Sequence, residues 1–367
     1  MNEGTTSAPD ESFAENMNEE PSLIGPMELS YATEYSVDLY EHGYAHIHVA
    51  DGNSYVLIPE GKPVVSLGDE DATIIQMPCD SIYLAASSVM DLFHELEALE
   101  NIRSCSTKAE DYGNQEVQTA IESGNIQYVG KYSAPDYEQL IMNQTCLAIE
   151  STMIYHSPKI KEELEGLGIP VLVERSSYEG NPLGRLEWIK LYGLLLGKRE
   201  LAEELFEKQM ENVNSVLASL DESEKEKPKV LFFYLSSNGY VNVRKPGDYV
   251  SKMIAMAGGE YAMDSLQIDE ENALSTVNIS WEDFYYYGKD ADIIIYNGTI
   301  DGGITSKEDL LQQNALFQEF KAVQENRVYC STGNMYQESS KIGEIIENLY
   351  AVIHQKETTL DYIKYVD

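Results

Sequence analysis

The chain has 367 residues, a length that predicts two domains, each large enough to bury its own core. It carries 25 Lys and Arg against 63 Asp and Glu, a formal net charge of −38. Such an acidic surface repels phosphate backbones and anionic headgroups, which excludes nucleic-acid binding and charge-driven docking on a membrane. The apolar content of 43% excludes global disorder. The acidity is typical of an exported or surface-exposed protein, although halophilic cytosolic proteins share it.

Residues 1–27 are predicted to be a disordered acidic tether. The first 22 residues contain six acidic side chains, no basic one and no apolar periodicity. No run reaches the ~18 apolar residues of a membrane span, and no secretory signal is visible. We therefore expect an extracytoplasmic protein, a cell-surface lipoprotein or a periplasmic protein, that meets the membrane only through a lipid anchor absent from this sequence. A native floppy terminus is the alternative.

Residues 28–182 are predicted to form an N-terminal α/β lobe. A hairpin is expected over 44–58, where two alternating runs flank Asp51-Gly52-Asn53. Ser87 or Ser88 is the expected N-cap of the first helix. Strands alternating with short helices indicate parallel β/α units. The strands are expected at 81–88, 125–130, 145–150 and 169–174, and the helices at 89–99 and 157–168.

Residues 183–222 are predicted to be one linking helix, because apolar residues recur at three- and four-residue steps. Gly193 and Gly197 mark a bend or break within it. Residues 223–367 form the predicted C-terminal α/β lobe. Its strands are expected at 229–237, 240–244, 291–298 and 327–332, and its helices at 248–259, 306–323 and 335–354. The predicted fold is therefore α/β, with two Rossmann-like lobes joined by one long α-helix.

The common catalytic motifs are absent from the sequence. There is no P-loop, no dinucleotide-binding glycine pattern, no G-x-S-x-G and no H-E-x-x-H. We therefore expect no catalytic residues and no enzymatic activity.

The cysteines and histidines give no strong metal signal. The four cysteines lie far apart without C-x-x-C, so no zinc site is expected among them. Cys146 and Cys330 are predicted to be buried thiols, and a bridge between Cys79 and Cys105 is left open. His46 and His48 share one face of a predicted strand, with His42 nearby. They are either metal ligands or an exposed hairpin face, and the exposed face is favoured because zinc sites need three or four assembled ligands.

Several segments in combination resemble one protein family. They are GKYSAPDYEQL (130–140), LGIPV (167–171), NPLGRLEW (181–188), VLFFYLSSNGYV (230–241) and VNISWEDFYYYGKDADIIIYN (277–297). Together they resemble the class III substrate-binding proteins of ABC importers, which bind ferric siderophores, haem or cobalamin, over about residues 28–356. Asn181 stands where that family has His, and the hairpin 44–58 is an addition. Because of these two departures, the resemblance does not determine which ligand is bound.

The resemblance implies two lobes that hold a small-molecule metal chelate between them and deliver it to an ABC importer permease. The expected ligand is an iron chelate, either a siderophore or haem, and the expected protein is a monomer without a resident cofactor or metal. The motifs place the two permease-docking glutamates at Glu138 and Glu282, whose alternative reading is a solvated carboxylate favoured by the helix dipole. The alternative functions are cobalamin or corrinoid binding, a sensor or adhesion module without transport, or an enzyme on the same fold.

Ligands of α/β sheets bind beyond the carboxyl ends of the strands, so the residues there are the candidate contacts. Arg suits carboxylate and catecholate oxygens, and Tyr and Trp stack on flat rings. In the N-terminal lobe the predicted ligand-binding residues are Ser88, Met90, Lys131, Tyr132, Thr152, Met153, Tyr155, His156, Arg175 and Tyr178, with Ser87 and Ser151 beside them. In the C-terminal lobe they are Tyr240, Arg244, Trp281, Tyr296 and Tyr336, with Asn238, Asn297 and Met335 beside them.

Some of these residues have two readings. Tyr155 and His156 could supply an axial ligand to haem iron, but loop packing or helix capping is favoured for both. Met153 is interpreted as a packing residue. Arg175 and Arg244 could instead form salt bridges with neighbouring acids. Arg185 is interpreted as structural, paired with Glu187 or another acid.

Overall fold

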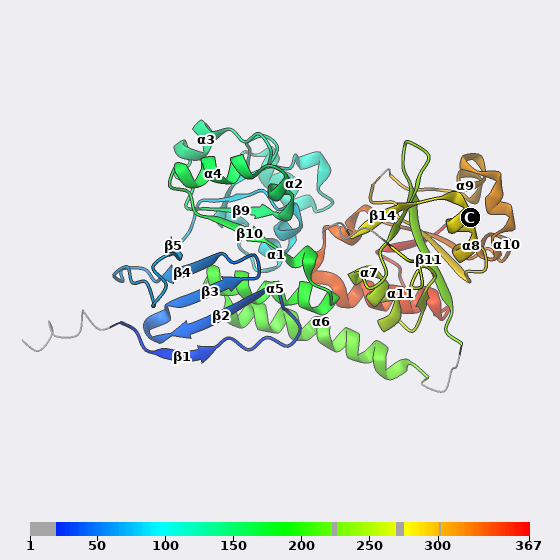
Figure 1. Cartoon of the computed structure of the whole chain (residues 1–367), viewed down its shortest axis with the longest axis horizontal. Coiled ribbons are helices and arrows are strands. Elements are labelled where there is room, and N and C mark those ends of the chain that lie inside the picture. The colour runs from blue at the N-terminus through cyan, green and yellow to red at the C-terminus, as the bar shows by residue number, and fades with distance from the viewer. Residues whose placement is uncertain (1–19, 222–225, 269–274, 301) are drawn as a thin grey trace, which may run out of the picture. The chain divides into compact units, whose positions relative to one another are not determined.

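The computed structural model describes residues 20–221, 226–268, 275–300 and 302–367 (Figure 1). These residues form two compact units, one of residues up to Glu28 with Tyr35–Pro78, the other of Leu29–Glu34 with Cys79–Asp367. Most of the predicted tether, residues 1–19, lies outside the described residues. Its last part is not disordered, because Leu23–Pro26 forms strand β1. None of the helices in the described part of the chain is both long and apolar enough to span a membrane.

The first unit is a five-stranded sheet. Its strand order is β1–β2–β3–β4–β5, antiparallel except for the parallel pair β4–β5. The strands are β1 (Leu23–Pro26), β2 (Tyr35–Tyr40), β3 (Ala45–Val49), β4 (Ser54–Ile58) and β5 (Thr73–Gln76). The predicted hairpin is confirmed as β3 and β4, whose turn contains Gly52 at φ 91°. It belongs to this separate unit, however, and not to the N-terminal lobe as the boundary 28–182 implied.

The second unit contains the N-terminal lobe, built on a parallel sheet of order β10–β9–β6–β7–β8. The strands are β6 (Ile82–Leu84), β7 (Ile102–Cys105), β8 (Gln127–Tyr128), β9 (Leu147–Ser151) and β10 (Val171–Glu174). The helices are α1 (Met90–Glu95), α2 (Gln115–Glu122), α3 (Tyr137–Met142) and α4 (Pro158–Gly166). Neither Ser87 nor Ser88 caps α1 as predicted, because both belong to a 3-10 turn, Ser87–Val89, that leads into the helix.

The predicted linking helix is two helices, α5 (Pro182–Leu195) and α6 (Arg199–Ser219), packed against each other. The chain turns at Gly197, whose φ of 68° favours glycine. Gly193 allows the close approach, since a Cβ there would lie 2.4 Å from the Cβ of Ala202. The two glycines that marked a break in the sequence therefore mark a reversal of the chain.

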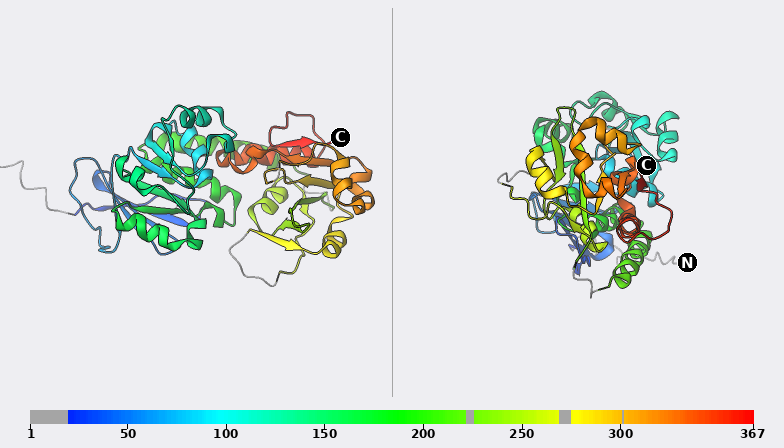
Figure 2. Two further views of the ribbon diagram at one scale, coloured as in Figure 1. Left: turned by 90° about the horizontal axis from the view of Figure 1, so that it is seen from above. Right: turned by 90° about the vertical axis from the view of Figure 1, so that its right-hand side faces the viewer.

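The C-terminal lobe is a mixed sheet of order β14–β12–β11–β15–β16–β17, with β13 beside β11. The strands are β11 (Lys229–Leu235), β12 (Val241–Arg244), β13 (Glu260–Tyr261), β14 (Thr276–Ile279), β15 (Ile293–Tyr296), β16 (Val328–Ser331) and β17 (Ile363–Tyr365). The helices are α7 (Tyr249–Met256), α8 (Trp281–Gly288), α9 (Lys307–Gln313), α10 (Lys321–Gln324) and α11 (Ile342–Ile353). Helix α11 packs on α6 and α7, so the α6 helix joins this lobe to the rest of the unit (Figure 2). The predicted α/β fold of two lobes is confirmed.

One disulfide joins Cys79 to Cys146, with the Cα atoms 5.7 Å apart. The two cysteines precede β6 and β9, which are adjacent strands, and the Cys146 N–H donates to the carbonyl of Ser81. The prediction of a free thiol at Cys146 is therefore wrong, and the bridge between Cys79 and Cys105 is not formed. Cys105 and Cys330 are buried free thiols.

A carboxyl group lies unpaired in the core of the N-terminal lobe. Glu150 on β9 is fully buried, and neither carboxylate oxygen has a hydrogen-bond partner. The Tyr83 hydroxyl, on the adjacent strand β6, is likewise buried without a partner. Burial raises the pKa of Glu150 to about 8, because the charged form loses its hydration. Glu150 is therefore protonated in the folded protein at neutral pH.

Removing the disulfide should destabilise the second unit. The bridge spans a sequence separation of 67 residues, for which loop-closure entropy predicts a contribution of about 4 kcal/mol. We expect Cys79→Ser/Cys146→Ser to lower the free energy of unfolding in urea by about 2–4 kcal/mol. A reductant should shift the unfolding midpoint of the wild type but not that of the variant, and equal shifts in both would contradict the bridge.

Glu150 should make stability depend on pH. Its pKa in the folded protein lies above 4.5, the ordinary value for glutamate, so unfolding releases a proton between pH 4.5 and pH 8. Wild-type stability should therefore fall as pH rises through that window. We expect Glu150→Gln to be more stable than the wild type at pH 8 by on the order of 3 kcal/mol, and close to it at pH 4.5. Glu162→Gln on exposed α4 is the control, and a pH-independent difference for Glu150→Gln would reject the burial argument.

Candidate functional site

The parallel strands of the N-terminal lobe end along one edge of the sheet, so the loops that follow them lie together. The strands β9 and β10 are direct neighbours in the sheet. The loop after β9 is a 3-10 turn, Thr152–His156, which begins where the Ser151 hydroxyl accepts the N–H of Met153. The loop after β10 is the 3-10 turn Ser176–Tyr178, which follows Arg175.

Arg175 lies at the centre of this edge. Its Nη1 donates to the hydroxyl oxygen of Tyr155 at 2.8 Å. Its guanidinium carbon lies 4.5 Å from the ring centroid of Tyr178 and 5.8 Å from that of Tyr155, within cation–π range. Its Nε donates to Glu34 Oε2 at 2.7 Å. Arg175 is therefore paired with an acid, the alternative reading of the sequence, and it also holds a phenol.

The side chains around Arg175 and Tyr155 are partly exposed to solvent. Tyr155 is 39% exposed and Met153 45%. The hydroxyls of Thr152 and Ser177 lie 3.4 Å apart. The predicted residues that the structure gathers at this edge are therefore Thr152, Met153, Tyr155, Arg175 and Tyr178. We call Tyr155, Arg175 and Tyr178 the N-lobe aromatic group.

The other predicted residues of this lobe lie apart from that group. His156 ends the turn after β9 with an exposed side chain, and Lys131 is exposed after β8. Tyr132 packs against the core of the lobe, and Met90 is buried within it. Met90 begins α1 and is 1% exposed, so it is buried and not open at the strand end.

In the C-terminal lobe, Tyr240 and Trp281 lie close together. Tyr240 is 57% exposed in the turn between β11 and β12. The neighbouring Gly239 carbonyl accepts a hydrogen bond from Trp281 Nε1 at 3.1 Å. The Trp281 ring packs edge-on against Phe284. Trp281 therefore anchors the turn that presents Tyr240.

Arg244 and Tyr296 are not exposed at a strand end, contrary to the prediction. Arg244 is 7% exposed and donates to both carboxylate oxygens of Asp248, at 2.8 and 3.2 Å. Its guanidinium lies over the rings of Tyr249 and Tyr336. Tyr296 is fully buried, and its hydroxyl accepts the N–H of Leu235. Both faces of this central sheet are covered, so strand residues on either face become interior.

Tyr336 is half-buried and belongs to the same stack as Arg244. Burial raises its pKa above the ordinary range of tyrosine. Arg185 on α5 lies over Tyr249 at 4.8 Å, so a residue of the linking helices joins this stack. Glu187 accepts backbone N–H groups of Ser30, Tyr31 and Ala32. Arg185 interacts electrostatically with another acid, Glu174, whose pKa is raised by burial and lowered to a smaller extent by Arg185.

The two lobes meet where α1 faces the turn before α11. The Ser340 N–H donates to Asp91 Oδ2 at 2.8 Å, and Lys341 Nζ donates to Glu95 Oε2 at 2.7 Å. The predicted ligand contact Ser88 serves here as well, since its carbonyl accepts the Ser339 hydroxyl at 2.8 Å. This set of three contacts is called the lobe junction below.

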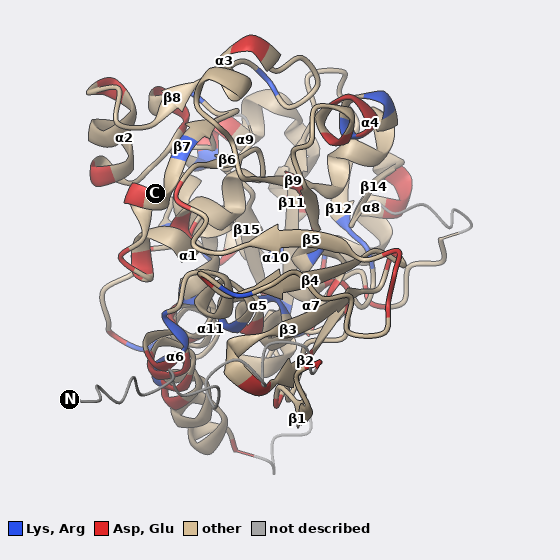
Figure 3. Cartoon of the chain, turned by 90° about the vertical axis from the view of Figure 1, so that its left-hand side faces the viewer, with Lys and Arg blue, Asp and Glu red and all other residues tan. Residues whose placement is uncertain are grey.

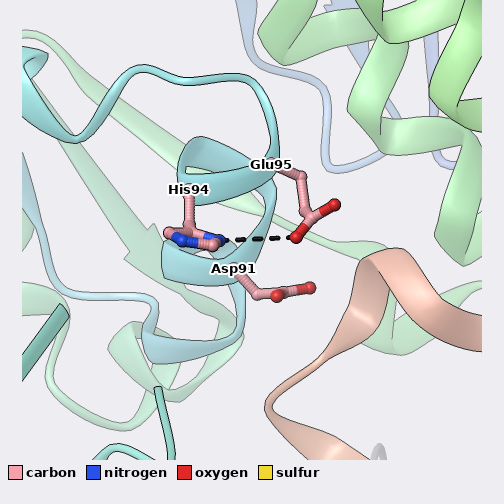
Figure 4. Close-up of side chains that lie close together, drawn as sticks. All are labelled: Asp91, His94 and Glu95. Atoms are coloured by element: carbon pink, nitrogen blue, oxygen red, sulfur yellow. Dashed lines mark ion pairs between the residues drawn. The ribbon is translucent and has the colours of Figure 1, made fainter. Parts of the chain in front are cut away.

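The lobe junction contains a group of metal-type ligands. Asp91, His94 and Glu95 lie on α1 with one ligand atom each within 4.8 Å of one another (Figure 4). Each of the three has other partners, because Asp91 binds Ser340, Glu95 binds Lys341, and His94 Nε2 lies 3.1 Å from Glu116 Oε2. Burial raises the pKa of Asp91 to about 6, against the opposing effect of the Ser340 hydrogen bonds. This group is therefore explained by the contact between the lobes.

The two glutamates named by the family motifs occupy equivalent places. Glu138 is the second residue of α3, and Glu282 is the second residue of α8. Both side chains are exposed. Acidic residues occur on many helices, including α2 and α4 (Figure 3), so exposure alone does not distinguish Glu138 and Glu282.

Sequence reasoning missed Glu34, Asp91 and Tyr249. Glu34 reaches Arg175 across 141 residues, and no local pattern signals such a contact. Tyr249 directly follows Asp248, the N-cap of a helix that was predicted, but its place between two arginines depends on α5. Asp91 and Glu95 could have been found as an acidic pair at i and i+4 on a predicted helix.

Comparisons with known proteins agree with this architecture. An uncharacterized lipoprotein of Methanocaldococcus jannaschii is 26% identical over 364 residues, covering 93% of this chain and 81% of its own. A periplasmic heme-binding protein of Vibrio cholerae has a TM-score of 0.58 at 18% identity, covering 73% of this chain and 98% of its own. The periplasmic vitamin B12-binding protein of the same organism has a TM-score of 0.53 at 14% identity, covering 77% and 99%.

The family model described as periplasmic binding protein matches residues 83–333. This segment runs from β6 to the turn after β16, so it includes both linking helices and most of both lobes, while α11 and β17 lie beyond it. It also includes the whole N-lobe aromatic group. The chain therefore belongs to the periplasmic binding protein family.

Proposed function

We propose that this protein is an extracytoplasmic solute-binding protein that captures an iron chelate, a siderophore or haem, between its two lobes. It delivers that ligand to the permease of an ABC importer. The family supports binding and transport as the general role. The choice of an iron chelate is carried by one observation, the hydrogen bond from Arg175 to the Tyr155 hydroxyl at a strand end.

A phenol in this position suits ferric iron. A guanidinium that donates to a phenol oxygen favours the phenolate, which is an axial ligand of haem iron in some proteins. Tyr155 is 39% exposed, and Met153, which is 45% exposed, offers an apolar surface in the same turn. Tyr178 and Tyr240 add rings on which a flat chelate could stack. No separate cofactor is part of the proposal.

A corrinoid is the alternative ligand. The vitamin B12-binding protein of Vibrio cholerae shares the fold, and stacking on Tyr178 and Tyr240 would suit any large macrocycle. The two ligands would use Tyr155 differently, because a corrinoid has no iron to which the phenolate could bind.

Ligand choice can be read from visible spectra. We expect the absorption spectrum to change when haemin or a ferric siderophore binds, with a Soret shift in the case of haemin. Addition of cyanocobalamin should leave the spectrum unchanged. Tyr155→Phe removes the iron ligand and should weaken binding at least about tenfold and alter the spectrum. Tyr286→Phe, an exposed tyrosine on α8, is the matched control.

Selective binding of cyanocobalamin would favour the corrinoid. No binding of any of these compounds, or a Tyr155→Phe variant indistinguishable from wild type, would reject the iron chelate.

Docking to the permease can be tested separately. In cells that carry the cognate importer, Glu138→Ala/Glu282→Ala should keep ligand affinity but lose uptake of labelled ligand, because the carboxylates pair with permease arginines. The control is Glu116→Ala/Glu308→Ala, which removes exposed glutamates at the same second position of α2 and α9. Uptake that survives the first double variant, or is lost equally in both, would contradict specific docking.

A further inference from the structure

The sheet of the first unit carries a second group of ligand-type side chains, independent of the proposed transport function. The whole unit, which ends at Pro78, precedes the segment that the family model matches, residues 83–333. Four of its side chains, Asp38, His46, His48 and Asp69, are here called the His–Asp group. His46 and His48 alternate on β3 and so share one face of the sheet, and Asp38 on β2 is the cross-strand partner of His46.

The members of the His–Asp group face one another in two pairs. His46 Nε2 lies 3.2 Å from Asp69 Oδ2, and His48 Nε2 lies 3.5 Å from Asp38 Oδ2. The two imidazole rings are 4.0 Å apart between centroids. A tetrahedral zinc ion with nitrogen and oxygen ligands at about 2.0–2.2 Å places neighbouring ligand atoms about 3.3–3.5 Å apart. Both imidazole–carboxylate separations are close to that spacing.

His46 is the strongest evidence for a ligand. Its side chain is 5% exposed, so it is not the exposed hairpin face that the sequence favoured. Its Nε2 faces Asp69 at 3.2 Å but lacks the alignment of a hydrogen bond, and it has no other hydrogen-bond partner. A buried ring nitrogen is thus directed at a carboxylate without a hydrogen bond to satisfy it.

The carboxylate of Asp69 is held in place. The Ser54 hydroxyl donates to its Oδ2 at 2.7 Å, and the Asp71 N–H donates to its Oδ1 at 3.1 Å. Ser54 is the cross-strand partner of His48, so the loop that bears Asp69 is bound to the same face of the sheet. Hydrogen bonds of this kind orient metal ligands in known sites. His48 and Asp38 are about 40% exposed, which leaves an ion a way in.

We propose that the His–Asp group binds one divalent transition-metal ion of the zinc class. Two imidazoles and two carboxylates are a donor set that suits zinc and its neighbours better than magnesium or calcium. Binding of one ion by both pairs would require the partly exposed His48 and Asp38 side chains to rotate toward His46 and Asp69. The ion would connect β2, β3 and the loop before β5.

The test is metal binding by the whole chain. After treatment with a chelator, titration calorimetry with Zn²⁺ should show one saturable site per chain, and Co²⁺ should give the visible absorption of a tetrahedral complex. His46→Ala/His48→Ala removes two direct ligands and should weaken binding at least about 100-fold, since loss of even an outer hydrogen-bond partner costs 10–100-fold. Circular dichroism checks that the metal-free variant is folded.

A second variant tests the site in case the double histidine variant does not fold. Asp38→Asn changes a half-exposed residue and should weaken binding about tenfold. His94→Ala disrupts the α1 group of Asp91, His94 and Glu95 and should leave Zn²⁺ binding unchanged. The proposal is overturned if the wild type shows no saturable site, or if His94→Ala abolishes binding while His46→Ala/His48→Ala does not. Neither result depends on whether the lobes bind an iron chelate.

Discussion

Two buried carboxylates hold the segment on which the candidate site depends. Glu179 accepts the N–H groups of Thr33 and Glu34, and also the indole N–H of Trp188. Glu187, fully buried on α5, accepts the N–H groups of residues 30–32. Buried carboxylates are tolerated only when hydrogen-bonded, and isolated backbone N–H groups have the same requirement. The carboxylates and the backbone N–H groups therefore satisfy each other's hydrogen-bonding requirement. These hydrogen bonds fix residues 30–34 against the start of α5.

This fixed segment sets the chemistry of the strand ends. It places Glu34 at 2.7 Å from Arg175, and Arg175 in turn holds the Tyr155 hydroxyl. Gly184 permits the arrangement, since a Cβ there would lie 2.7 Å from the carbonyl oxygen of Tyr31. Because Arg175 is paired with Glu34, its charge is not available to bind an anionic ligand. Its remaining hydrogen bond at this edge is to the phenol of Tyr155, and this contact is the reason why an iron chelate is proposed and not a simple carboxylate.

The lobes are joined by polar contacts as well as by helices. The lobe junction contains two pairs that involve carboxylates of α1, with Asp91 buried and its pKa raised to about 6. The stack of Arg185, Tyr249 and Arg244 is apart from that junction along the chain and is largely buried. Contacts of this kind suit a protein whose lobes move little about stiff helices, which is the expectation for this family. The first unit is separate from the two lobes in the division of the chain, and the metal site proposed for the His–Asp group belongs to that unit alone.

The sequence by itself determined the β/α alternation, the hairpin at Gly52 and the family, because these depend on local periodicity, turn residues and short motifs. The helix break near Gly197 was visible for the same reason. Only the tertiary structure decided that Cys79 pairs with Cys146, that Arg244 and Tyr296 are interior, and that Glu34 neutralises Arg175. These outcomes depend on which strands are neighbours and which faces are covered, and such long-range contacts leave no periodic trace in the chain.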